Sequence, residues 1–563
     1  MSQPRQAMKI QVSELIVRFL ERLGIDCVFG MPGAHILPVY DALYDSSIRT
    51  VLAKHEQGAA FMACGHARVS GGIACCITTA GPGATNTVTA VASAYADRQP
   101  LLLITGETST HIFGKGGLQE SAGEGGAIDQ CTLFEGITRY RRLIERTDYL
   151  ANVLNQAARE LLSDTPGPVL LSLPFNVQKE QVDEAILDQV VTSRPLNGIH
   201  VRHEQIDALA DLLLDARNPV IVAGYGCIRS GGEALVERLS ETLDIPMTTS
   251  LKGKGVIAEN SPRSLGSLGV TSTGFAYRYI VDHADSVIFL GAGFNERTSY
   301  LWDQALLAGK RIAQVDNDPQ QLNKVFKADV AVIGDIRAVL DGVLSRIGQQ
   351  GGARSRATGT RAPHVPARRR EAGTSEIFRA GFSVVERFFR RLQAEHLPGL
   401  MVFDDNIIFA QNFLDVTEGV RFFPNSGISS LGHAIPAAIG ARFAREVPAM
   451  AILGDGGFQM CCMELMTAVN YDIPITVVMF NNATMGLIRK NQAQNYAGRY
   501  IDCDFVNPDY RQLAASFGMA HHCIARPDEV DAVFEQVDFV AGRTLIEIVL
   551  ERDAFPNYDS RRH

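Results

Sequence analysis

The feature that most constrains the fold is a run of apolar and glycine-rich segments between residues 449 and 482. Residues 449–453 are an apolar run short enough for a buried strand, and residues 454–457 read Gly-Asp-Gly-Gly, a glycine-rich turn. Apolar residues then recur at helical spacing from Phe458, and residues 475–480 form a second, β-branched run. A strand, turn, helix and strand in this order form a right-handed crossover between two parallel strands. The sequence therefore predicts an α/β architecture.

Two polar residues stand just past the ends of these strands. They are Asp455 and Asn482. Because parallel neighbours lie about 4.8 Å apart, both side chains can converge on one point. Carboxylate and amide oxygens suit Mg²⁺, and the adjacent helix start offers backbone N–H groups to a phosphate. Either motif alone is more commonly an ordinary turn or strand end, but their joint spacing predicts a Mg²⁺-bound diphosphate.

The same alternation runs through the rest of the chain. Helical patterns occur at residues 12–23 and 84–96, and strand patterns occur at residues 27–29, 50–53, 72–79, 101–105, 219–223, 286–290 and 311–315. We therefore expect doubly wound parallel sheets whose sites lie at the carboxyl ends of the strands. A stretch rich in Arg, Gly, Ala and Pro interrupts the pattern and is typical of a solvated linker. The predicted organisation is an N-terminal domain at 1–188, a central domain at 189–347, a linker at 348–374 and a C-terminal domain at 375–563.

Composition excludes several classes of function. The 563 residues are 46% hydrophobic and 20% charged, as in an ordinary globular protein. The net charge of −9 argues against a nucleic-acid partner. No apolar run approaches the roughly 20 residues of a membrane span, so we expect a cytoplasmic protein. The ten cysteines show neither zinc spacing nor a disulfide framework, and we assign them no chemistry.

The spacing of the Gly-Asp-Gly and Asn-Asn motifs resembles that of the thiamine diphosphate (ThDP) enzymes. In that family an Asp, the second Asn and a backbone carbonyl two residues later bind the metal. The resemblance implies that Asp455, Asn482 and Thr484 hold Mg²⁺ here. It also implies that Leu431 supports the bent form of the cofactor.

A second motif of this family surrounds Glu56. Alone, a Glu between a strand and an Ala-rich helix is most often a solvated first-turn residue. Residues 55–60, His-Glu-Gln-Gly-Ala-Ala, are however similar to the glutamate motif of ThDP enzymes, and residues 78–86 resemble the loop beside the pyrimidine ring. The resemblance implies that Glu56 activates the cofactor through its aminopyrimidine. It also implies an active site shared across a dimer interface, so that a monomer is inactive.

Within the family, the chain is most similar to acetolactate synthases. Leu118-Gln119-Glu120 resembles the synthase Phe-Gln-Glu, which implies that Gln119 contacts the substrate. Residues 247–255, 291–297 and 315–319 resemble FAD-contacting segments, although the glycine clusters alone lack a dinucleotide fingerprint. This implies a FAD site with Arg297 as a phosphate partner. Asn491 stands where synthases carry a Trp, so we expect an acceptor larger or more polar than 2-ketobutyrate.

Two short segments are similar instead to benzaldehyde lyase. They are Gly-Ala-His-Ile at residues 33–36 and Ile-Asp-Gln at residues 128–130. This likeness implies that His35 is a relay for the substrate hydroxyl, although a lone His is more often structural. For His111 and His433 we expect structural roles.

The predicted function is a ThDP- and Mg²⁺-dependent decarboxylating carboligase. It transfers an acetaldehyde unit from pyruvate, a 2-oxo acid, to a carbonyl acceptor, and any FAD is structural. We expect a homo-oligomer, a dimer that pairs into a tetramer, with no nucleic-acid or membrane partner. The alternatives are an acyloin lyase or 2-oxo acid decarboxylase, a ThDP flavoenzyme that oxidises pyruvate, and a silent binding subunit. The predicted catalytic residues are Glu56, Gln119 and His35, and the predicted cofactor-binding residues are Pro32, Gly33, Glu56, Pro82, Asn86, Arg297, Asn406, Gly427, Leu431, Gly454, Asp455, Gly456, Gly457, Asn482, Thr484, Met485 and Gly486.

Overall fold

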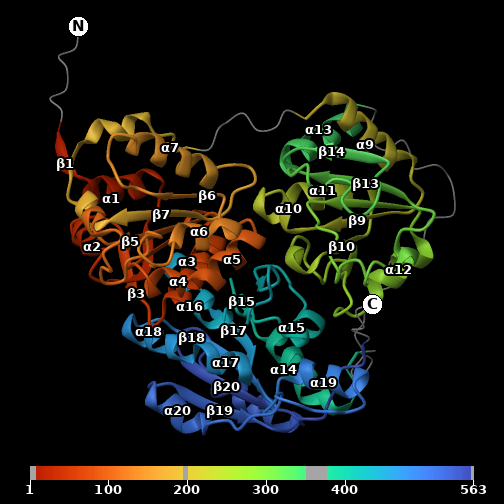
Figure 1. Ribbon diagram of the computed structural model, residues 1–563. Helices are drawn as coiled ribbons and strands as arrows, with labels where there is room; N and C mark the ends of the chain where they lie inside the picture. Colours follow the sequence, from red (N-terminus) through yellow and green to blue (C-terminus); the bar gives the residue numbers. More distant parts are fainter. Residues whose placement is uncertain (1–7, 194–200, 350–376, 379, 559–563) are drawn as a thin grey trace. The chain divides into compact units, whose positions relative to one another are not determined.

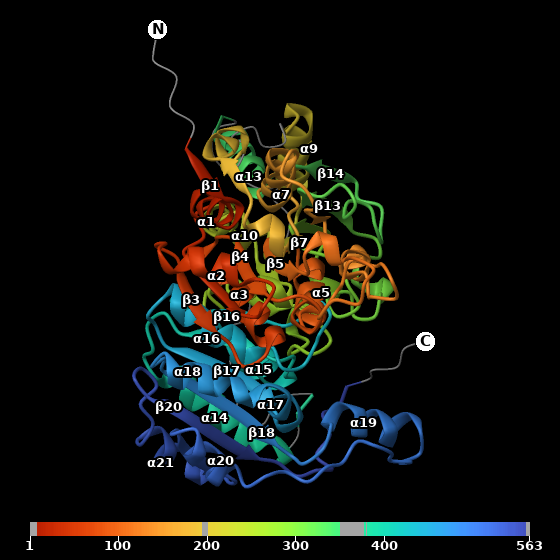
Figure 2. The same ribbon diagram turned by 60° about the vertical axis from the view of Figure 1, so that its left-hand side comes forward.

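The structure is a computed structural model of the chain that describes residues 8–193, 201–349, 377–378 and 380–558 (Figures 1 and 2). Its residues group into two compact units. The first unit comprises Met1–Leu196, Asn425–Ala451 and Gly457–Ile475, and the second comprises Asn197–Pro424, Ile452–Gly456 and Thr476–His563. Most of the predicted linker, residues 350–374, lies outside the described residues.

The N-terminal part of the first unit is a six-stranded sheet covered by helices on both faces. In spatial order the strands are β3 (Arg49–Leu52), β2 (Cys27–Met31), β4 (Ala74–Thr78), β5 (Leu101–Glu107), β7 (Val169–Pro174) and β6 (Tyr140–Leu143), all parallel. Helices α1 (Val12–Arg22), α2 (Leu37–Tyr44) and α7 (Leu150–Leu161) pack against one face (Figure 1). Helices α3 (Glu56–Ser70) and α5 (Val88–Ala96) cover the other. Because both faces are covered, the inner strands β4, β5 and β7 are buried along their whole length, whereas the edge strands β3 and β6 carry exposed polar residues.

A second six-stranded parallel sheet forms the central part of the chain. Its order is β11 (Ser264–Ser267), β10 (Met247–Thr249), β9 (Pro219–Ala223), β12 (Ser286–Leu290), β13 (Arg311–Asp316) and β14 (Val330–Ile333). Alternate residues of β12 serve opposite faces. Ile288 and Leu290 pack with α9 (His203–Asp215), α11 (Glu233–Leu243) and α13 (Ile336–Gln349), whereas Val287 and Phe289 pack with α12 (Phe275–His283).

The third six-stranded sheet contains the segment between residues 449 and 482, whose two strands are neighbours in it. Its order is β16 (Arg421–Pro424), β15 (Met401–Asp404), β17 (Ala449–Gly454), β18 (Ile475–Asn481), β20 (Arg543–Val549) and β19 (Ala520–Ile524). Its helices in the second unit include α14 (Ser383–Ala394), α15 (Ile408–Phe413), α20 (Tyr510–Ser516) and α21 (Val530–Phe534), whereas α16 (Ala434–Ala444) packs against α3 in the first unit. The prediction of three doubly wound parallel-sheet domains is confirmed.

Two helices differ from their predicted course. The helix expected from Phe458 begins earlier, as α17 (Asp455–Cys461), passes through a 3₁₀ turn at Cys462–Glu464 and continues as α18 (Leu465–Asn470). The predicted turn at 454–457 is therefore mostly the first turn of α17. The helix expected over 84–96 is divided into α4 (Pro82–Thr85) and α5, because the Thr87 hydroxyl donates to the Ala84 carbonyl (2.7 Å) between them. Both breaks position side chains of the candidate site.

The cysteines and the membrane prediction can be compared with the structure directly. All ten cysteines are free. Burial raises the pKa of Cys27 and Cys64 to about 12, so both remain thiols at neutral pH. Among the described residues, no helix is long and apolar enough to cross a membrane.

Candidate active site

Glu56 is the first residue of α3. His55 precedes it in extended conformation and caps the helix, its Nδ1 accepting from the Gln57 amide at 3.1 Å. The Glu56 side chain is only 8% exposed. Asn86 donates its Nδ2 hydrogen to Glu56 Oε2 at 2.9 Å. The structure thus brings together two predicted cofactor-binding residues, and Glu56 is buried rather than solvated.

The loop that carries Asn86 owes its shape to Gly81 and Pro82. Gly81 precedes α4 with φ of 61°, a left-handed conformation that glycine adopts readily, and Pro82 begins the helix. A Cβ built on Gly81 would lie 3.3 Å from Gln119 Cβ. The glycine therefore lets the loop of Asn86 approach the loop of Gln119.

His35 and Gln119 form the second group of predicted residues. His35 Nδ1 lies 3.2 Å from Gln119 Oε1, and the Thr79 hydroxyl donates to the same oxygen at 3.4 Å. Because an amide oxygen only accepts hydrogen bonds, His35 Nδ1 carries the hydrogen and Nε2 keeps its lone pair. This tautomer leaves Nε2 able to take a proton.

The backbone at His35 is fixed by its neighbours. Gln178 donates to the His35 carbonyl at 2.7 Å, and a Cβ on Gly106 would lie 2.4 Å from that oxygen. On the other side of the loop, a Cβ on Gly33 would lie 2.5 Å from Thr79 Cβ, so only glycine fits there. The neighbouring Pro32 is exposed.

Two acidic residues outside the predicted set, Glu107 and Glu120, accept hydrogen bonds from the backbone of the segment that contains Gln119. Gln119 has φ of 55°, an uncommon conformation for a non-glycine residue. Buried Glu107 at the end of β5 accepts from the Ser121 amide at 3.0 Å, and Glu120 accepts from the Gly117 amide at 2.8 Å. Burial raises the pKa of Glu107 to about 7. Its sequence signal was a carboxylate at the end of a strand that begins with the apolar run Leu101–Ile104.

The segment before α16 contains Gly427 and Leu431. A Cβ on Gly427 would lie 2.6 Å from Asp97 Oδ1, and Leu431 is half-buried. The Oγ atoms of Ser426 and Ser430 are buried with no hydrogen-bond partner among the described residues. Buried hydroxyl groups in this state can form hydrogen bonds with a polar ligand.

The other two histidines differ in environment. His433 packs edge-on against Phe61, with ring centroids 5.2 Å apart. Burial lowers its pKa to about 3, so the ring is neutral, as expected of a structural histidine. His111 is exposed on a 3₁₀ turn.

Glu464 is a further residue that the sequence analysis did not select. Its side chain is 3% exposed, and its carboxylate accepts from the backbone amides of Lys54 (3.1 Å) and His55 (2.9 Å) and from the Thr467 hydroxyl (2.8 Å). These amides directly precede Glu56, so Glu464 fixes the start of α3. A Cβ on Gly58 would lie 2.2 Å from Glu464 Oε1, which explains the glycine.

The second unit contains the predicted metal ligands. Asp455 is 1% exposed. Its Oδ2 accepts hydrogen bonds from the Ala483 amide (2.7 Å) and from Asn507 Nδ2 (2.8 Å). Its Oδ1 accepts one hydrogen bond, from the Gly456 amide (3.0 Å). Oδ1 therefore keeps a lone pair open for a cation. Burial raises the pKa of Asp455, and a bound cation would offset that cost.

Asn482 and Thr484 lie in a turn that faces Asp455. Ala483 between them has φ of 52°, which points its amide at the Asp455 carboxylate. Thr484 donates its hydroxyl to the Cys503 carbonyl at 2.7 Å, and a Cβ on Gly486 would lie 2.8 Å from Asn482 Nδ2. The candidate ligands are all oxygens, which fits Mg²⁺. No group of three or more His, Cys, Asp or Glu residues within the described part of the chain offers another metal site.

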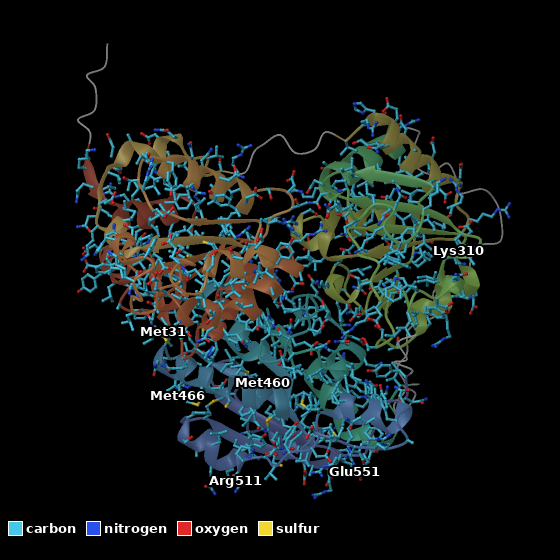
Figure 3. The ribbon with its side chains drawn as sticks, viewed as in Figure 1. Met31, Lys310, Met460, Met466, Arg511 and Glu551 are labelled. Atoms are coloured by element: carbon cyan, nitrogen blue, oxygen red, sulfur yellow. The ribbon has the colours of Figure 1, made fainter. Side chains whose placement is uncertain are left out.

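Glycines keep the start of α17 open. Gly454 ends β17, and the nearest atom to a Cβ built there is Ile407 Cδ1 at 3.7 Å. A Cβ on Gly456 would lie 2.8 Å from Met485 Sδ, so Met485 covers this glycine, and Gly457 follows in the helix. Figure 3 labels two methionines further along the chain. Met460 on α17 is largely exposed, and Met466 on α18 is half-buried. An open helix start is suited to a diphosphate.

Asn406 and Arg297 are the remaining predicted contacts. Asn406 follows β15 with φ of 65°. Its Oδ1 and Arg297 Nη1 are buried without a hydrogen-bond partner among the described residues. Burial raises the pKa of Asp404 to about 7, and the nearby charge of Arg297 opposes that rise. An unpaired guanidinium N–H fits a phosphate group, as the FAD prediction requires.

Three family models match the chain in order. They are the thiamine pyrophosphate enzyme N-terminal TPP binding domain at residues 10–129, the central domain at 206–343 and the C-terminal TPP binding domain at 406–548. The chain is also 32% identical over 569 residues to the probable acetolactate synthase large subunit of Methanocaldococcus jannaschii, covering 96% of this chain and 92% of the relative. The chain belongs to the thiamine pyrophosphate enzyme family.

Thiamine pyrophosphate is ThDP, so the predicted family and its cofactor are confirmed. Other ThDP relatives are the acetolactate synthase isozyme 2 large subunit of Escherichia coli K12, 30% identical over 96% of this chain and 95% of the relative, and the mitochondrial catalytic subunit of Saccharomyces cerevisiae, 29% identical over 96% and 80%. The likeness to acetolactate synthases is thus confirmed as well. These relatives do not favour the lyase alternative.

Proposed function

We propose that this ThDP enzyme is a Mg²⁺-dependent carboligase of the acetolactate synthase type. It releases CO₂ from pyruvate and transfers the remaining two-carbon unit to a carbonyl acceptor. The observation that carries the proposal is the buried pair of Glu56 and Asn86, held at 2.9 Å in the same unit as His35 and Gln119. Bound ThDP supplies the nucleophilic carbon and stores the electron pair that decarboxylation leaves.

The residues of the first unit supply the proton chemistry. Glu56 holds a proton toward the aminopyrimidine nitrogen, and Asn86 orients its carboxyl group through Oε2. His35 Nε2 exchanges a proton with the substrate hydroxyl, while Gln119 fixes the ring through Nδ1. A base positioned in this way contributes about 10²- to 10⁴-fold to a rate.

The second unit supplies the anchor for the diphosphate. Asp455, Asn482 and the Thr484 carbonyl would hold Mg²⁺, and the backbone amides at the start of α17 would donate to the diphosphate. Arg297 would contact a phosphate of FAD, and this FAD would be structural because the addition consumes no electrons. The enzyme is a dimer in which Glu56 of one subunit serves the ThDP held by the other, and dimers pair into tetramers.

The acceptor follows from the departure at position 491. Where acetolactate synthases carry a Trp, this chain has Asn491. An amide leaves more room and offers hydrogen bonds, so the acceptor is larger or more polar than 2-ketobutyrate.

The test is product analysis by mass spectrometry. Purified enzyme receives pyruvate, ThDP and Mg²⁺, with and without an added aldehyde, and CO₂ and every carbon product are followed. We expect acetolactate, or an acetyl group joined to the aldehyde, and loss of both in Glu56→Gln. Release of free aldehyde alone would indicate a decarboxylase, and substrate-dependent bleaching of a flavin would indicate an oxidase. No CO₂ from pyruvate with ThDP bound would contradict the proposed donor.

A further inference from the structure

Asn507 is a polar residue that no step of the proposed chemistry uses, and it contacts the carboxylate of Asp455. Its Nδ2 donates to Asp455 Oδ2 at 2.8 Å and to Asn481 Oδ1 at 2.7 Å. One amide group therefore ties the acid after β17 to the residue that ends β18.

The orientation of this amide is itself fixed. Tyr510, the first residue of α20, is 3% exposed and donates its hydroxyl to Asn507 Oδ1 at 2.9 Å. Because a tyrosine hydroxyl that donates requires an acceptor, Asn507 presents its oxygen to Tyr510 and its NH₂ group to Asp455. The amide cannot flip without losing all three bonds.

The network continues away from the site. Asn481 donates to Glu547 Oε1, and Glu547 Oε2 lies 2.9 Å from His521 Nε2. Glu547 is on β20, the neighbour of β18, and His521 is on β19, the edge strand beyond it. The position of Asn507 is thus set by rigid elements and not by its own loop alone.

The hydrogen bonds of Asp455 determine which of its two carboxylate oxygens can bind a cation. Oδ2 already accepts two hydrogen bonds, from Asn507 and from the Ala483 amide, whereas Oδ1 accepts one. Without Asn507 the carboxylate would lose one of the two hydrogen bonds to Oδ2, and so one of the three that set its rotation.

From this geometry we propose that Asn507, oriented by Tyr510, is a positioning residue for Asp455 and sets the affinity of the enzyme for Mg²⁺ with ThDP. The inference rests on the proposed role of Asp455 as a metal ligand. Partners that orient metal ligands typically contribute 10- to 100-fold to metal affinity. We therefore expect Asn507→Ala to raise the apparent Kd for Mg²⁺ by about that factor.

The experiment titrates MgCl₂ into the full-length protein at a fixed ThDP concentration by isothermal calorimetry. Tyr510→Phe keeps the amide but removes its orienting donor, and we expect a smaller rise in Kd. Gln205→Ala is the matched control, because Gln205 is a half-buried amide of the same unit that donates to the Ala331 carbonyl (3.0 Å). We expect its Kd to equal that of the wild type. The increase in Tm on adding ThDP and Mg²⁺ should shrink in parallel.

The outcomes separate the inference from the proposed function. If the wild-type protein binds no ThDP with Mg²⁺, the proposed metal site is contradicted, and the inference about Asn507 fails with it. Wild-type binding with an unchanged Kd in Asn507→Ala would overturn the inference alone, even if that variant has a lower Tm without ligand. Should Asn507→Ala fail to fold, an unchanged Kd in Tyr510→Phe would overturn it equally.

Discussion

At the scale of single residues, the function of each side chain depends on what surrounds it. His35 is half-buried, and its Nδ1 hydrogen is held by Gln119, whose own backbone is left-handed. Such a backbone costs about 1 kcal/mol or more and persists where the surroundings impose it. Here Glu107 and Glu120 impose it through the amides of Ser121 and Gly117. The Gln119 side chain is thereby directed at the imidazole.

This coupling can be measured with a double-mutant cycle on His35 and Gln119. We expect His35→Ala to lower kcat about 10²-fold, the lower end for a positioned proton-transfer group, with ThDP affinity unchanged. Gln119→Ala should have a smaller effect, and the double variant should resemble His35→Ala, because Gln119 acts through the ring. Steady-state rates of CO₂ release provide the measurement. Full additivity of the two losses would show that the residues act independently.

At the scale of elements, the start of α3 determines where Glu56, the first residue of the helix, is placed. Its position relies on Glu464, the last residue of the 3₁₀ turn between α17 and α18, which accepts hydrogen bonds from two backbone amides just before Glu56. Within one unit, residues more than 400 apart in sequence thus meet at this helix end. A carboxylate at a helix N-terminus is also favoured by the helix dipole.

Removing this carboxylate should destabilise the protein and displace Glu56. We expect Glu464→Ala to lower the free energy of unfolding by about 1 to 3 kcal/mol, because the amides of Lys54 and His55 lose their acceptor in a buried place. We also expect a lower kcat. Glu464→Gln is the matched control, since its amide oxygen still accepts and the loss should be smaller. Urea unfolding and CO₂ release report the two effects, and equal stability of Glu464→Ala and wild type would contradict this role.

The sequence predicts elements better than it predicts their junctions. The strands at 219–223 and 286–290 match β9 and β12 because buried β-branched runs bounded by turn residues are unambiguous. The break at Asn86–Thr87 and the 3₁₀ turn before Leu465 depend on hydrogen bonds with distant partners or local hydroxyls, which periodicity does not register. Glu464, Glu107 and Asn507 were missed for the same reason.

At the scale of the whole molecule, two buried carboxyl groups predict how stability depends on pH. Burial raises the pKa of Glu107 from 4.5, and that of Asp404 from 3.8, to about 7. Each folded-state pKa lies above its unfolded value, so the stability these groups contribute is present at low pH and is lost as pH rises through about 7. At about 1.4 kcal/mol per pKa unit, the loss is at most roughly 3.5 kcal/mol for Glu107 and roughly 4.5 kcal/mol for Asp404.

The variants Glu107→Gln and Asp404→Asn isolate these contributions. Each amide keeps the acceptor oxygen and cannot ionise, so we expect the free energy of unfolding to fall less steeply between pH 5 and 8 than in the wild type. The exposed Glu204, at the first turn of α9, provides the control Glu204→Gln, which should leave the slope unchanged. Urea unfolding at a series of pH values provides the measurement. Slopes equal to that of the wild type would show that neither pKa is raised.

The proposed sharing of the active site between subunits predicts complementation of inactive variants. Glu56→Gln removes the activating carboxyl and Asp455→Ala removes a metal ligand, so each homo-oligomer should be inactive. In a dimer of one chain of each, one site receives both defects and the other receives neither. Co-expressed chains with different tags, purified through both tags, should therefore recover about half of the wild-type activity per dimer, because each dimer has one intact site of two.

The same dimers distinguish an active site shared between two chains from one formed by a single chain, because the two cases leave different numbers of intact sites. If each chain supplied its own Glu56 and Asp455 to one site, every site in the mixed dimer would contain a defect and no activity would return. Doubly tagged Glu56→Gln dimers, in which both chains carry the same substitution, should stay inactive and so exclude contamination by wild type. Recovery close to one half would thus assign Glu56 and Asp455 of a working site to different chains, whereas absence of recovery in folded mixed dimers that bind ThDP would assign them to one.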